Sequence, residues 1–320
     1  MPDWLSGIGT RIGSLFGSRT PSTHLGVFGK HPGWNDHLDD VGLDSEPLIA
    51  TKQYLYVQGI GGIVDAGQWE ALPNGDALPE FRHTFVWSDA DNILVGKLWS
   101  SSDGKGRTKY PMVLCSHFAN RREITIPNIV PLLEQLEQSF RATNSADDVR
   151  RLVAEAASAA SLLISSHAVQ SNSRTAYAEG IGIKPDSEAA ARIAYFAENH
   201  FDGLANGGVS GARINLKLGQ LTTQPQHMRV PAQASDPLAT LQFWRAFLTA
   251  TIPAGTPQLY IAPAGSPWLD VIVGLPTAKH LFCLRAGLNA VPLASEIPYN
   301  LTAEFRSKAI KYWQDFLAAA

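Results

Sequence analysis

Residues 81–99, FRHTFVWSDADNILVGKLW, contain two strand-like runs on either side of a turn, and this pattern decides the expected fold. The runs 81–87 and 92–99 are rich in β-branched and aromatic residues, which favour strands. Residues 88–92 are polar and turn-forming, so the two runs are predicted to pair as an antiparallel hairpin. A third strand is expected at residues 109–117, after a long polar loop. The stretch therefore predicts an antiparallel sheet.

Other segments show the apolar spacing typical of helices or strands. Helices are expected at residues 46–65, 127–140, 145–165, 186–201, 237–251 and 301–317, and further strands at 25–28, 213–218, 258–262, 268–273 and 280–285. A polar loop that contains Pro225 and Pro231 is expected between the strand at 213–218 and the helix at 237–251. The fold class is thus α/β of the α+β type, with mixed, largely antiparallel sheets flanked by helices. Both halves would run strand, helix, three strands, helix. This order suggests two similar β-α-β-β-β-α halves, although no residue-level repeat accompanies it.

The chain divides into four regions by composition and by these elements. We expect an N-terminal arm at 1–22, an N-terminal α/β region at 23–142, a helical middle segment at 143–210 and a C-terminal α/β region at 211–320. Two arrangements of the halves remain open, separate subdomains or one extended sheet.

Composition excludes several classes of protein. The 320 residues include 45% hydrophobic and 17% charged side chains, as in ordinary globular proteins. With 26 basic and 29 acidic residues, the chain lacks the basic excess of a nucleic-acid-binding surface. Its two cysteines lie in apolar runs, which indicates buried thiols in a reducing compartment. No segment has the length of a transmembrane helix, so a cytoplasmic protein is expected, with weak membrane contact through residues 4–16 as a minor option.

The polar loop GKHPGWNDH, residues 29–37, follows the first predicted strand and offers candidate chemistry. His31, Asp36 and His37 are the residue types that bind metals, and a metal-dependent hydrolase built on them is one hypothesis. The chain has no Walker A loop, dinucleotide fingerprint or nucleophile elbow, so we expect no cofactor and no enzymatic activity. Trp34 has two interpretations, an exposed interface residue or a side chain folded back onto the core.

Two motifs resemble the TagF (ImpM) family of accessory proteins of bacterial type VI secretion. The first is Gly26-Val27-Phe28-Gly29-Lys30-His31-Pro32 with Asp36 after it, and the second is Ser102–Arg107 leading to Tyr110–Leu114. Weaker similarity follows at Phe243-Trp244, Gln258–Ile261 and Gly274–Pro276. The spacing from Arg107 to Pro111 is one residue longer than the family's pattern, which indicates a divergent member.

The resemblance implies a non-catalytic regulator that acts post-translationally on secretion assembly, in some members by binding a forkhead-associated scaffold protein. A structural component of the secretion apparatus is a further alternative. The residues of the two motifs that we expect to form signature or binding loops are Gly29, Lys30, Pro32, Trp34, Asp36, Asp103, Gly106, Arg107 and Pro111. Glycine permits positive φ, proline stiffens turns and the charged groups can link loops. Whether these loops contact a partner or hold their own structure stays open.

Overall fold

The computed structural model describes residues 22–73, 75–89, 92–119, 126–163, 173–200, 226–249, 252 and 256–319. Its strands are β1 (Ser22–Gly29), β2 (Arg82–Ser88), β3 (Asn92–Ser100), β4 (Pro111–Ala119), β5 (Gln226–Pro231), β6 (Gln258–Pro263) and β7 (Trp268–Val273). Its helices are α1 (Glu46–Thr51), η2 (Lys52–Ile60), α2 (Gly61–Asp65), α3 (Ile126–Arg141), α4 (Ala146–Leu163), α5 (Arg174–Gly180), α6 (Glu188–His200), α7 (Pro237–Thr249), α8 (Ala278–Leu281), η5 (Phe282–Leu284) and α9 (Ala303–Ala318).

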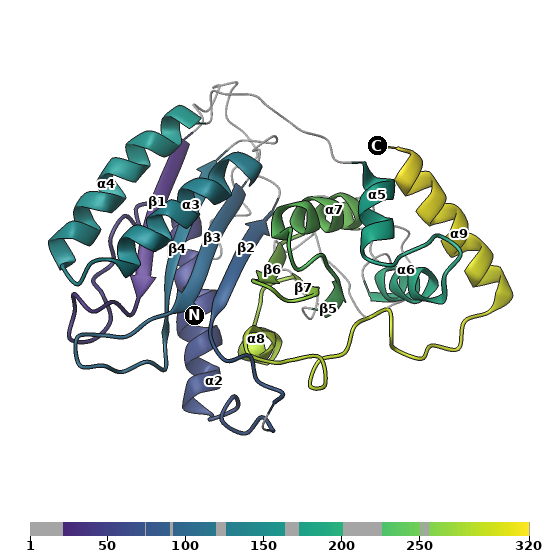
Figure 1. Ribbon diagram of the computed structural model, residues 1–320, viewed down its shortest axis with the longest axis horizontal. Coiled ribbons are helices and arrows are strands. Elements are labelled where there is room, and N and C mark those ends of the chain that lie inside the picture. Colours follow the sequence, from purple (N-terminus) through teal and green to yellow (C-terminus); the bar gives the residue numbers. More distant parts are fainter. Residues whose placement is uncertain are drawn as a thin grey trace, which may run out of the picture.

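The strands form one antiparallel sheet in the order β1-β4-β3-β2-β6-β7-β5, which confirms the predicted α+β class. The predicted hairpin of β2 and β3 lies near its middle (Figure 1). Phe85 of β2 pairs with Gly96 of β3 in this hairpin, and a Cβ on Gly96 would lie 2.2 Å from the Phe85 ring. The glycine therefore leaves room for the aromatic side chain.

Alternating side chains of the strands face two separate hydrophobic cores. Val86 and Val95 pack with the helices α3, α4, α6, α7 and α9 on one face, whereas Phe85 and Leu94 pack with α1, η2, α2 and α8 on the other. Helices therefore cover both faces of the sheet (Figure 1). No helix in the described part of the chain is long and apolar enough to span a membrane.

Most predicted elements have counterparts in the structure. The helix expected at 46–65 is one continuous helix, but its central part, η2, is π-helical, which the sequence did not predict. The predicted regions 23–142 and 211–320 contribute β1–β4 and β5–β7 to the same sheet, in which β2 pairs with β6.

Two predictions in the second half are wrong. Residues 280–285, predicted as a strand, form parts of α8 and η5. Residues 226–231, predicted as a polar loop, form β5. The second half therefore has two described strands after α7, not three. The strand predicted at 213–218 and the arm at 1–22 lie outside the described residues, apart from Ser22.

Candidate functional site

The two motif segments meet where β1 ends beside the start of β4. Gly29, the last residue of β1, has φ +112°, and a Cβ there would lie 2.3 Å from the carbonyl oxygen of Pro111. Only glycine accepts this conformation and this contact readily. The next amide, of Lys30, donates to the same oxygen at 3.1 Å. Residues 29–37 and 103–111, called here the paired loops, therefore start from one point of the sheet.

Lys30 forms the buried centre of the paired loops. Its side chain points inward and the residue is only 3% exposed. Its Nζ donates to Asp103 Oδ2 at 2.9 Å and to Asp36 Oδ1 at 2.5 Å. Asp103 is 2% exposed, whereas the side chain of Asp36 is 68% exposed. A buried ammonium requires such carboxylate partners. Lys30 therefore holds Asp36 of the first loop and Asp103 of the second loop beside each other.

Asp103 also organises the loop that contains it. Its Oδ1 accepts hydrogen bonds from the backbone N–H groups of Lys105 and Arg107, and its Oδ2 accepts one from Arg107 Nε at 2.7 Å. Gly106 provides the positive φ, +78°, that this tight turn requires. Burial opposes the charge of Asp103, but the hydrogen bonds from Lys30 and Arg107 outweigh it and hold the pKa of this carboxyl far below its ordinary value.

Arg107 connects the second loop to the first. Its Nη2 donates to the carbonyl oxygen of Asn35 at 2.8 Å and lies 3.1 Å from Asp36 Oδ1. The amide of Gly104 donates to the carbonyl oxygen of Trp34 at 2.6 Å. Side-chain and backbone bonds thus cross between loops that lie about seventy residues apart in the sequence, as the separation of 73 between Lys30 and Asp103 shows. The paired loops form one structural unit.

His31 anchors the first loop to the core. Its Nε2 donates to the carbonyl oxygen of Phe140 at 3.0 Å, and its Nδ1 accepts the amide of Gly33 at 3.1 Å. Both ring nitrogens are therefore occupied, and burial lowers the pKa of this histidine, which favours its neutral form. Of the three predicted metal ligands, Asp36 and His37 are neighbours, with Nδ1 and Oδ1 3.2 Å apart. The ring of His31 is bonded elsewhere and does not converge with Asp36 and His37 on one point. The predicted set of three metal ligands is therefore not assembled.

His37 lies on an aromatic surface made by two tyrosines. Its ring centroid is 5.7 Å from that of Tyr56 in η2 and 5.2 Å from that of Tyr110. Tyr56 donates to the carbonyl oxygen of Pro111 at 3.3 Å, so the π-helix contacts the paired loops directly. Burial, followed by the nearby charge of Lys30, lowers the pKa of His37.

Trp34 is folded back, in agreement with one of its two interpretations. It is partly buried against the core, and its Nε1 donates to Asp39 Oδ2 at 3.0 Å. Arg150 of α4 covers the indole at 5.3 Å from the ring centroid and also donates to Asp39. Pro32 and Gly33 form the turn before it, where a Cβ on Gly33 would lie 2.7 Å from the amide nitrogen of Ala146. Trp34 therefore docks the first loop on α4.

The outer edge of the paired loops remains open to solvent. It is called here the loop rim and consists of the exposed residues Asn35, Asp36, His37, Lys105, Arg107 and Thr108. Hydrogen bonds from Lys30 keep the pKa of Asp36 below its ordinary value, as they do for Asp103. Such carboxylates are weak bases and hold no proton near neutral pH, so they suit ionic recognition better than general acid–base chemistry. The rim offers both charge signs on a rigid support.

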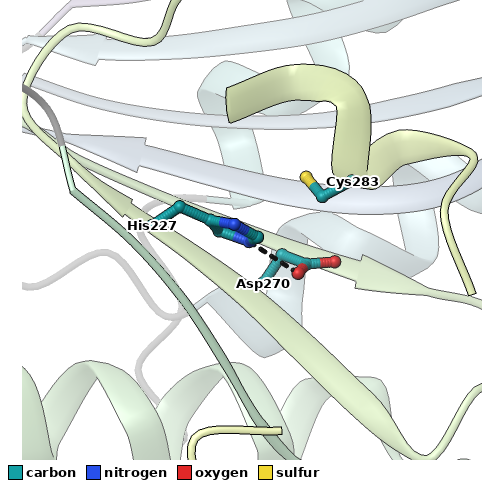
Figure 2. Close-up of side chains that lie close together, drawn as sticks. All are labelled: His227, Asp270 and Cys283. Carbon is teal, nitrogen blue, oxygen red and sulfur yellow. Dashed lines mark hydrogen bonds and ion pairs between the residues drawn. The ribbon is translucent and has the colours of Figure 1, made fainter. Parts of the chain in front are cut away.

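A second polar cluster, which the sequence analysis did not predict, lies on β5, β7 and η5. The ligand-type atoms of His227, Asp270 and Cys283 lie within 4.8 Å of one another, the one such group found in the described residues (Figure 2). Arg229, however, donates to both oxygens of Asp270 at 2.8 and 2.9 Å, and His227 donates to the first of these at 2.8 Å. Because burial also raises the pKa of the Cys283 thiol, we interpret the cluster as a structural ion pair.

Arg229 shows what the second cluster holds together. Its guanidinium, fully buried, also donates to the carbonyl oxygens of Gly287 and Val291 at 2.9 and 3.1 Å. It thus fixes the segment after η5 against the edge of the sheet. No periodic signal in the sequence reveals this pair, because its members are 41 residues apart in two strands.

No protein-family model matches the chain, and no curated protein matches it.

Proposed function

We propose that this protein is a non-enzymatic accessory protein of a bacterial type VI secretion system. It acts in the cytoplasm, post-translationally, through protein–protein contacts on the assembling apparatus. The observation that carries the proposal is the meeting of the two TagF-like motifs in one ionic unit, in which Lys30 of the first motif binds Asp103 of the second. The contact gives the two motifs, whose residues Lys30 and Asp103 are 73 positions apart, a shared structural role.

The roles of the motif residues support a recognition surface. The shape of the paired loops depends on two buried charged residues, Lys30 and Asp103. It also depends on two glycines with positive φ, Gly29 and Gly106. The side chains of Asp36 and Arg107 are 68% and 51% exposed while they remain bonded to that interior. Charged groups held in fixed positions favour specific contacts, because little conformational entropy is lost on binding. A partner would therefore bind at the loop rim.

Affinity purification of the full chain from cells that produce it tests this function. We expect components of the secretion apparatus, including a forkhead-associated scaffold protein, to co-purify at stoichiometric amounts. Recovery of none of these components would contradict the proposal.

A pair of charge reversals tests the loop rim specifically. Lys105→Glu places a negative charge on the rim, whereas Lys184→Glu makes the same change at an exposed site between α5 and α6, far along the molecule (Figure 1). Recovery of the partner should fall at least tenfold for the first variant and stay unchanged for the second. Equal recovery with both variants would place the contact elsewhere.

A further inference from the structure

Arg245 of α7 is a charged side chain without a counter-ion. Its Nε atom is buried and has no hydrogen-bond partner among the described residues. In that same part of the chain no carboxylate forms an ion pair with it, and burial lowers the pKa of its guanidinium. An unpaired charge held away from water is costly, and native proteins retain such groups mainly where they serve a purpose.

Arg245 also lines an open hollow on the surface of α7. The pocket has a volume of about 520 Å³ and is lined by Arg174, Gln242, Arg245, Ala246 and Thr249. The hollow is shallow and open to solvent, and its volume is comparable with that of small-molecule sites. The polar lining groups are two guanidiniums, an amide and a hydroxyl, and none of these described lining residues is acidic. Most of the accessible lining is apolar, and both charged residues among these described lining residues are arginines.

Arg174 is held in place at the start of α5. Its Nη1 donates to the carbonyl oxygen of Phe316 at 3.0 Å, and its guanidinium lies 4.6 Å from the centroid of the Phe316 ring. A guanidinium has five N–H donors, so this single bond leaves donors for a ligand. Anchoring of one arginine and partial burial of the other reduce the entropy that binding would cost.

We propose that this pocket binds the phosphate group of a small phosphorylated ligand. A phosphate monoester carries a charge of about −1.5 to −2 near neutral pH, which two arginines match, whereas a carboxylate carries only one charge. Guanidinium also bonds to phosphate oxygens in a bidentate manner. Gln242 and Thr249 supply further donors at the same pocket. The site lies on α7 and does not depend on the paired loops or on the function proposed for them.

Titration calorimetry of the full chain with inorganic phosphate, O-phosphoserine and acetate, at constant ionic strength, tests the site. Both phosphate compounds should bind saturably and acetate at least tenfold more weakly. Arg245→Gln should weaken phosphate binding at least tenfold, while Arg151→Gln, the same change at an exposed arginine of α4, should leave it unchanged. Equal binding of acetate, or unchanged binding by Arg245→Gln, would overturn the proposal. Binding of inorganic phosphate without O-phosphoserine would overturn the assignment to a phosphorylated ligand.

Thermal unfolding provides a second readout that separates a ligand site from a structural role. Without phosphate, Arg245→Gln should be at least as stable as the unmodified protein, because it removes a buried charge that has no partner. With saturating phosphate the order should reverse, since only the unmodified protein gains stability from binding. Strong destabilisation by Arg245→Gln in both conditions would show that Arg245 is structural and would overturn the proposal.

Discussion

Removal of the Arg107 side chain should loosen the paired loops without unfolding the protein. Its Nε donates to buried Asp103 at 2.7 Å, and its Nη2 donates to the carbonyl oxygen of Asn35 at 2.8 Å. Hydrogen bonds that involve charged groups contribute about 1.5–3 kcal/mol each, but the side chain is 51% exposed and solvent screening reduces this contribution. We therefore expect Arg107→Ala to lower the free energy of local opening by about 1–2 kcal/mol.

Hydrogen exchange measures this loss directly. A change of about 1–2 kcal/mol corresponds to roughly 5- to 30-fold faster exchange. The amides of Gly104 and Gly106 report on it, because they donate to the carbonyl oxygens of Trp34 and Asp103. The rest of the sheet should keep its protection.

Two further variants make the experiment decisive. Arg151→Ala removes an exposed arginine that pairs only within α4 in the described structure, and it should not change exchange in the paired loops. Arg107→Lys should give an intermediate effect, because an ammonium cannot reproduce the geometry of the guanidinium. Unchanged exchange at residues 103–107 in Arg107→Ala would refute the reasoning, as would an equal acceleration across the whole protein.

Three other predictions concern the buried charges and the close approach of the loops. Asp270→Ala should lower the free energy of unfolding by about 3–5 kcal/mol, because it leaves the buried guanidinium of Arg229 without its carboxylate partner. The double variant Asp270→Leu/Arg229→Met should lower it much less, because it removes both charges. Equal losses of stability for the two variants in urea unfolding would contradict the pairing. Gly29→Ala should lower the free energy of unfolding by more than about 1 kcal/mol, because φ at this position is +112° and the new Cβ would collide with the carbonyl oxygen of Pro111. A smaller loss of stability in urea unfolding would count against this contact. The folded pKa of Asp103 lies below the unfolded value of about 3.9, so its contribution is present above that value and is lost as pH falls through the folded pKa. Loop protection, corrected for intrinsic exchange, should therefore hold from pH 7 to about 5 and fall only in acid; loss near pH 6 would contradict this.

The sequence predicted elements whose pattern is long or regular. The hairpin of β2 and β3 follows from two alternating runs around a polar turn, and the helix at 46–65 follows from its apolar spacing. The π-helical geometry of η2 was not predictable in this way, because the same residues satisfy an α-helical pattern. It depends on packing, for example of Tyr56 against Phe28 in β1.

The two wrong predictions have a common physical cause. Residues 281–284, Leu-Phe-Cys-Leu, form a short apolar run, and such a run is compatible with a buried strand or a buried helix. Residues 226–231 lie between Pro225 and the end of a polar stretch at Pro231, a pattern that predicts a loop. Arg229 is nevertheless fully buried because Asp270, in another strand, neutralises it. In both segments the residues are buried by contacts with distant parts of the chain, which the local pattern does not specify.

The sequence drew attention to the residues of the paired loops and offered linkage by charged groups as one of two roles, but it did not show which of these groups are buried. The two motifs drew attention to Lys30 and Asp103, and only the structure shows that this lysine is buried and bonded to the second loop. The open question about Trp34 was also decided by a contact from α4, a helix more than a hundred residues further along the chain, as the separation of 111 between Asp39 and Arg150 shows.

The topology explains why the paired loops occur once although the two halves share an order of elements. From the centre outward the first half runs β2-β3-β4-β1 and the second β6-β7-β5, which is one strand fewer among the described residues. The end of β5 still lies beside the start of β7. There the amide of Ala232 donates to the carbonyl oxygen of Pro267, in the same way as the amide of Lys30 donates to the carbonyl oxygen of Pro111. The loop before β4 spans residues 101–110, whereas that before β7 spans only 264–267, too short for an aspartate turn closed by an arginine four residues later. Loop length, rather than strand arrangement, therefore confines the ionic unit to the first half.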